Sequence, residues 1–165
     1  MRATTSMKSL LVVLAGLVAT ACSDLGVDVR SLTELERAER KWERFGPESY
    51  VYAVERLCFC PTESMGPVRV RVTPGTVLRT YVATGDPVPE SYEWLFPTVD
   101  GLFDILRQAY ADEAHDVEVS YDEDLGYPTD FFIDYEEQVA DEELGMRVTE
   151  PPVAVPVVLP AGPGR

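Results

Sequence analysis

The sequence predicts a single α+β domain, a two-layer sandwich with two helices on one face of a mainly antiparallel sheet of about six strands. Two segments place apolar residues at three- and four-residue spacing, as amphipathic helices do. Shorter segments alternate apolar and polar residues, as half-buried strands do, and the links between them are short enough for hairpins. The expected order is therefore helix, three strands, helix, three strands.

The first helix is expected at residues 32–45. Ser31 offers an N-cap and Glu34 follows three residues later, which is the spacing of a capping box. Gly46 and Pro47 then end the helix. Its apolar stripe comprises Leu32, Leu35, Ala38, Trp42 and Phe45.

Three strands are expected next, at residues 50–60, 68–72 and 77–82. The second of them alternates valine with arginine, which directs the valines to a core and the arginines to water. Pro74 and Gly75 form a tight-turn signal between the second and third strands. This pattern predicts a hairpin.

A second helix follows a Pro-containing connection at residues 83–97, which is expected to hold one helical turn at residues 92–95. Thr98 caps this helix, and its apolar stripe comprises Val99, Leu102, Phe103, Leu106, Ala109 and Tyr110. The last strands are expected at residues 117–121, 129–135 and 144–148. The domain thus spans residues 31–150. The Pro-rich residues 151–165 are expected to form a disordered or extended tail, because proline is poorly tolerated in a central strand.

The N-terminal residues 1–21 have the features of a signal segment. Arg2 and Lys8 precede an apolar run that is too short to span a membrane, and Ala19-Thr20-Ala21-Cys22 resembles the lipobox of bacterial lipoproteins. This predicts a lipid on Cys22 followed by a tether that ends at residue 30. The alternative is an ordinary secretory signal cut after Ala21. Ser23 resembles the default sorting signal for the outer membrane in bacteria that have two membranes.

The charge of the chain excludes some partners. Without Arg2 and Lys8, 12 basic residues stand against 29 acidic ones, a net charge of −17. Nucleic acids and anionic lipid surfaces both require clustered basic residues, so neither is an expected partner. Membrane attachment is therefore expected through the N-terminal lipid alone, which places the protein in the cell envelope.

Several short motifs resemble a known family. They are Trp42, Ser49-Tyr50-Val51-Tyr52, Cys58-Phe59-Cys60-Pro61, Gly66-Pro67-Val68, Pro97-Thr98-Val99-Asp100-Gly101-Leu102-Phe103 and Gly126-Tyr127-Pro128. The stretch from Trp42 to Val148 is similar to the DUF6174 family of bacterial proteins, many of which carry lipoprotein signals. The resemblance implies an exported location and a shared fold, and it implies no activity.

Cys58 and Cys60 are the candidate pair for chemistry. On an extended strand their Cα atoms would lie about 6.6 Å apart, near the upper limit for a disulfide, so a bridge requires a bend that Pro61 would favour. Three interpretations remain open: a structural disulfide, a redox-active pair, or a soft-metal site for copper or zinc.

Three aromatic residues in the long connection, Tyr92, Trp94 and Phe96, form either a binding patch or a lid over the core. The acidic run at residues 122–126 departs from an EF-hand loop and is expected to be a polar turn. His115, the only histidine, is expected on a surface loop.

These features predict a non-enzymatic, lipid-anchored module that binds a protein partner in the cell envelope and needs no cofactor. In bacteria with two membranes it would face the periplasm from the outer membrane. The alternative is a thiol-disulfide redox or copper-handling protein that uses Cys58 and Cys60.

Overall fold

The structure is a computed structural model that describes residues 29–137, 139 and 142–156. Its elements are α1 (Val29–Phe45), β1 (Tyr50–Leu57), α2 (Thr62–Met65), β2 (Val68–Thr73), β3 (Thr76–Tyr81), α3 (Glu90–Glu93), α4 (Val99–Ala111), β4 (Asp116–Tyr121), β5 (Pro128–Asp134) and β6 (Leu144–Ala154). The predicted order of two long helices and six strands is confirmed. Within the described residues, no helix has the length and apolar character needed to cross a membrane.

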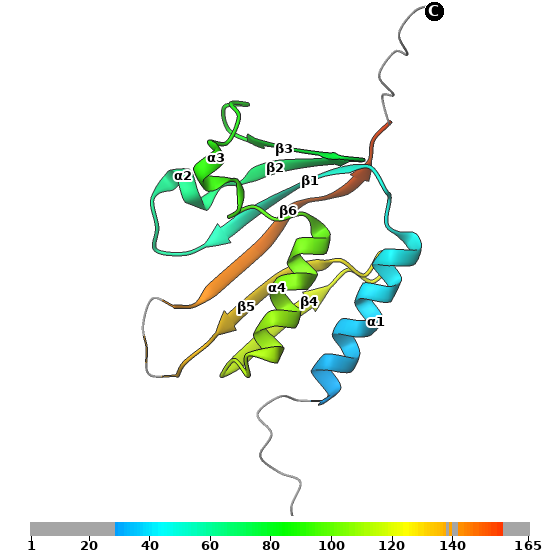
Figure 1. Ribbon diagram of the computed structural model, residues 1–165, viewed down its shortest axis with the longest axis vertical. Coiled ribbons are helices and arrows are strands. Elements are labelled where there is room, and N and C mark those ends of the chain that lie inside the picture. Colours follow the sequence, from blue (N-terminus) through cyan, green and yellow to red (C-terminus); the bar gives the residue numbers. More distant parts are fainter. Residues whose placement is uncertain (1–28, 138, 140–141, 157–165) are drawn as a thin grey trace, which may run out of the picture.

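The six strands form one sheet in the order β3-β2-β1-β6-β5-β4, and every neighbouring pair is antiparallel. Figure 1 shows α1 and α4 on the same side of this sheet. The contacts agree, because the Tyr50 side chain of β1 meets both helices. Its ring lies 5.3 Å from that of Trp42, and its hydroxyl oxygen accepts a hydrogen bond from the Val99 N–H. The predicted α+β sandwich is therefore confirmed, with α1 and α4 covering one face of the sheet. The opposite face is here called the open face.

The core lies between the helices and the covered face of the sheet. Every predicted stripe residue of α4 is buried, and β1 contributes Tyr50, Tyr52 and Val54. The alternation in β2 is also confirmed: Val68 and Val70 are fully buried, whereas the arginines between and after them point to the open face. Alternation along β2 thus directs its first two valines to the core and its arginines to the opposite face.

Two predicted boundaries were wrong, one at the start of α1 and one at the end of β1. Helix α1 begins at Val29, so Ser31 lies inside the helix rather than at its N-cap, and residues 29–30 are helical rather than part of the predicted tether. Strand β1 ends at Leu57, three residues earlier than expected, because the chain bends at Cys58–Cys60.

The prediction that the tail begins at Pro151 was also wrong. Strand β6 continues to Ala154 and pairs with Tyr50, although it is a central strand. The two prolines fit because the register shifts between Glu150 and Val153, so they occupy an irregular part of the ladder where proline is tolerated. Residues 157–165 of the predicted tail lie outside the described residues.

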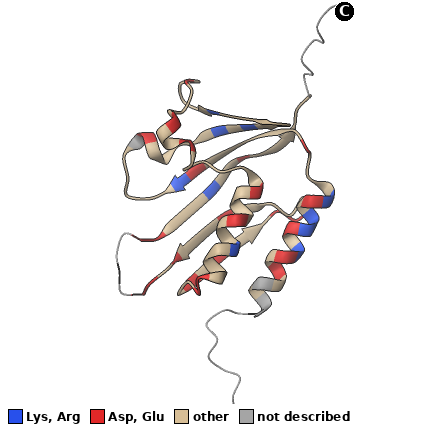
Figure 2. Cartoon of the chain, viewed as in Figure 1, with Lys and Arg blue, Asp and Glu red and all other residues tan. Residues whose placement is uncertain are grey.

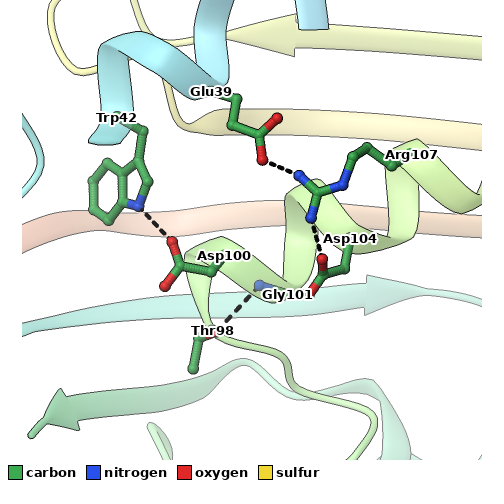
Figure 3. A network of polar contacts seen from close by, with 7 residues as sticks. All are labelled: Glu39, Trp42, Thr98, Asp100, Gly101, Asp104 and Arg107. Carbon is green, nitrogen blue, oxygen red and sulfur yellow. Dashed lines mark hydrogen bonds and ion pairs between the residues drawn. The ribbon is translucent and has the colours of Figure 1, made fainter. Parts of the chain in front are cut away.

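The first turn of α4 is where both long helices meet the sheet (Figure 3). The Trp42 indole Nε1–H of α1 donates to the Asp100 carboxylate at 2.9 Å. Thr98 caps α4 as predicted, since its hydroxyl accepts from the Gly101 N–H at 3.1 Å. From β1, Tyr50 accepts from the Val99 N–H at 3.0 Å and the Tyr52 hydroxyl donates to the Pro97 carbonyl. We call these residues the α4 junction.

The junction satisfies groups that a helix start would otherwise leave unpaired. The Val99 and Gly101 N–H groups lie in the first turn of α4, where no earlier helical carbonyl reaches them. Burial raises the pKa of Tyr50 to about 12. This effect outweighs the hydrogen bond with the Val99 backbone, which by itself lowers the pKa. Tyr50 therefore stays a neutral hydroxyl that can accept the Val99 N–H. Farther along, Arg107 of α4 forms ion pairs with Glu39 of α1 and with Asp104 (Figure 3).

Replacing Asp100 by alanine is expected to lower the free energy of unfolding by about 1–3 kcal/mol, because the buried Trp42 indole loses its acceptor. Asp104→Ala, which removes an exposed carboxylate from the same helix, is the matched control and should cost less than about 0.5 kcal/mol. Urea unfolding followed by tryptophan fluorescence measures both. Equal losses in the two variants would contradict this role for the junction.

Candidate functional site

Cys58 and Cys60 form a disulfide directly after β1. Their Cα atoms are 5.4 Å apart, closer than on an extended strand, because the chain bends through this segment before Pro61 precedes α2. The bend expected from the sequence is therefore present. Both cysteines are half-buried, so the bridge lies at the surface of the molecule.

Phe59, between the two cysteines, has a fully exposed side chain. Leu57 and Phe132 are also partly exposed, at 38% and 42%, and both belong to the open face. They flank Gly145 of β6, which pairs with Leu57 on one side and with Phe132 on the other. A Cβ at Gly145 would approach the Leu57 Cβ to 2.9 Å, so Leu57 lies directly over this glycine. Exposed apolar residues thus gather at the end of the sheet where β1 ends and β6 begins.

The three aromatics of the long connection do not form one patch. Phe96 is fully buried and Tyr92 packs against the core, whereas Trp94 is 76% exposed. Phe96 and Tyr92 therefore fit the interpretation as a lid over the core, and Trp94 alone keeps an exposed ring, because alternate residues around a helical turn do not share one face. Trp94 donates its indole N–H to the Ser91 carbonyl at 2.9 Å, which fixes the exposed ring.

The acidic run after β4 is a polar turn, as predicted. The Asp122 carboxylate accepts hydrogen bonds from the N–H groups of Asp124 and Leu125, at 3.0 and 2.6 Å. Gly126 has a φ of +84°, and a Cβ there would lie 2.4 Å from the Ala38 carbonyl oxygen, so only glycine lets this turn approach α1 so closely. The carboxylate that would lead a calcium loop is thus used within the turn.

The other candidates for chemistry stay apart. His115 is exposed after α4, far along the chain from the disulfide, and donates its backbone N–H to Tyr135. Within the described part of the chain, no three His, Cys, Asp or Glu side chains are placed to hold a metal ion together. An open depression beside α4 is lined by Asp104, Arg107, Gln108, Tyr110 and Ala111, and its arginine is already held by Glu39 and Asp104.

The sequence interpretation missed the apolar surface around Leu57 and Phe132. The available signal was the pair Phe131-Phe132 in a predicted strand. Consecutive strand residues point to opposite faces, so one of two adjacent phenylalanines had to leave the core. Phe131 is 2% exposed and Phe132 is the outward one. Cys22 lies outside the described residues, and its lipidation stays a prediction.

The motif residues that suggested a family have mainly structural roles. Trp42, Tyr50 and Asp100 belong to the α4 junction, and Tyr127 packs its ring 6.2 Å from that of Trp42. Gly66 lies between Val54 and Phe96, where little space remains for a side chain. Residues from five separate parts of the sequence therefore specify how this fold is assembled.

Comparisons with known proteins agree with this pattern. Residues 34–151 match the family described as "Family of unknown function (DUF6174)". No curated protein matches the chain, and no solved structure matches it either. The matched region runs from α1 through β6 and covers more than half of the sequence. The chain therefore belongs to the DUF6174 family.

Proposed function

We propose that this protein is a non-enzymatic, lipid-anchored interaction module of the cell envelope, and that it binds a protein partner through the loop that carries Phe59. The observation behind this proposal is a fully exposed aromatic side chain inside a loop closed by the Cys58–Cys60 disulfide. Burying a phenylalanine side chain is favourable by about 1.5–3 kcal/mol. Because the disulfide restricts the loop before contact, less conformational entropy is lost on binding.

We propose that the domain is located at a membrane surface outside the cytoplasm. The apolar run before Ala19-Thr20-Ala21-Cys22 supports export and lipidation. A disulfide between Cys58 and Cys60 suits the same compartment, because disulfides persist in oxidising spaces. In a host with two membranes, we expect the lipid to hold the domain on the periplasmic side of the outer membrane.

Site-specific photocrosslinking in living cells tests this function. The full-length protein would carry benzoylphenylalanine at position 59, at position 94 or, as a control, at the exposed α1 position 43. We expect a discrete protein adduct from position 59 and none from position 43. Cys22→Ala should release the domain from the membrane fraction and reduce the adduct, because the partner shares that membrane.

The variant Phe59→Ser tests whether the Phe59 side chain serves binding rather than the stability of the fold. The Phe59 side chain is fully exposed, so its loss should change the free energy of unfolding by less than about 0.5 kcal/mol. Absence of any adduct from position 59 in a normally folded, membrane-bound protein would refute the proposed binding loop. An adduct from position 94 alone would move the binding surface to Trp94.

A redox function is the second candidate, because the disulfide lies in a half-buried surface loop. In such a reaction a dithiol substrate would be oxidised to a disulfide while Cys58 and Cys60 accept its two electrons and two protons as thiols. Incubating the full-length protein across graded glutathione potentials, then alkylating it and recording its intact mass, distinguishes the two functions. A structural bridge should stay closed to below about −300 mV. Opening between about −120 and −270 mV, the range of known oxidoreductases, would favour the redox function instead.

A further inference from the structure

One end of the open face combines exposed apolar side chains with carboxylates. Leu57 and Phe132 flank Gly145, Glu118 lies directly opposite Phe132, and Asp116 lies opposite Asp134. Directly opposite residues in antiparallel strands share a face, so these side chains form one surface. We call Leu57, Phe132, Asp116, Glu118 and Asp134 the end patch. Phe59 follows Leu57 by two residues and lies at the same end of the sheet.

Several charges on the rest of the open face pair across neighbouring strands. Arg69 pairs with Glu150 at 2.7 Å, and Arg147 pairs with Asp130 at 3.0 Å and with Glu55 at 3.7 Å. On β2, the open face carries Arg69 and Arg71, away from the end patch. Figure 2 shows acidic residues where β5 ends and β6 begins.

The carboxylates of the end patch, in contrast, are not paired with basic side chains among the described residues. Asp116, Glu118 and Asp134 form no ion pair with any basic side chain in the described part of the chain. Asp116 and Asp134 also stand directly opposite one another, and like charges in that position destabilise a sheet. The folded domain alone thus gains nothing from this arrangement, whereas a cationic partner would relieve it.

We propose that the end patch binds a positively charged protein segment whose apolar side chains pack on Leu57 and Phe132. This inference rests on the proposed function and names the chemistry of its partner. Charge complementarity selects the occupant: lysine or arginine would face the three uncompensated carboxylates while an apolar residue covers the exposed leucine and phenylalanine. A second copy of this chain docked patch to patch would bring the same carboxylates together, so like-charge repulsion disfavours it.

Peptide binding to the full-length protein in nonionic detergent tests the partner's chemistry. The probe is a fluorescent peptide that alternates lysine with valine, and its counterpart alternates glutamate with valine. Fluorescence anisotropy should detect the lysine peptide and not the glutamate peptide. Glu118→Gln combined with Asp134→Asn should weaken binding at least tenfold, and Phe132→Ser should weaken it as well.

The matched control is Glu43→Gln combined with Glu48→Gln, which removes the same charge from exposed positions on and after α1. It should change binding less than twofold. Equal weakening by both double variants would show general attraction to an acidic protein and overturn the docking site. Unchanged binding by Phe132→Ser, or a protein dimer that the end-patch variant dissociates, would overturn it too.

Two further readouts separate this inference from the parent proposal and from misfolding. The melting temperature should not fall in Asp134→Asn, since the variant relieves the repulsion from Asp116. Crosslinking from position 59 should lose most of its yield when Glu118 and Asp134 are neutralised. If the adduct persists at full yield, Phe59 still marks a binding loop, but the partner is not held by the end patch.

Discussion

The hydrogen bond between the Trp42 indole and the Asp100 carboxylate joins the two long helices at the point where both reach the sheet. Trp42 also contacts the rings of Tyr50 and Tyr127, so one side chain connects α1 with α4, with β1 and with the turn before β5. The α4 junction therefore holds both helices on the same face of the sheet.

The open face carries the side chains that point away from both helices. With both helices on one side, alternation along the strands leaves arginines, carboxylates and a few apolar side chains in water. Several of the charges pair with one another across strands, as in Arg69–Glu150 and Arg147–Asp130. The end near the disulfide is different, since it joins uncompensated acids to exposed Leu57, Phe59 and Phe132. The proposed binding site is therefore placed where exposed apolar side chains meet carboxylates that are unpaired within the described residues.

Much of this fold could be predicted from the sequence because its patterns are local. The stripe of α4, the Thr98 cap and the alternating valines of β2 depend on residues a few positions apart. The failures depend on long-range contacts. Pro151 and Pro152 lie in a central strand because a shift in register against β1 accommodates them. No local sequence pattern indicates such a shift. Phe96 is buried in the core while Trp94 is exposed, and only the contacts of the folded chain distinguish the lid from the binding patch. The end patch joins residues from β1, β4 and β5, so it exists only once the sheet order is known.

Native-state hydrogen exchange at the Trp42 indole N–H and the Val99 amide tests the central role of the junction most directly. Both donors are paired, with Asp100 and with Tyr50, and they connect separate elements. They should therefore exchange only through global unfolding, with the same free energy as the amides of β1 and β6 in the centre of the sheet. Exchange of the indole and of Val99 through a much cheaper local opening, while the sheet stays protected, would contradict the account and show that the sheet holds its structure without the helices.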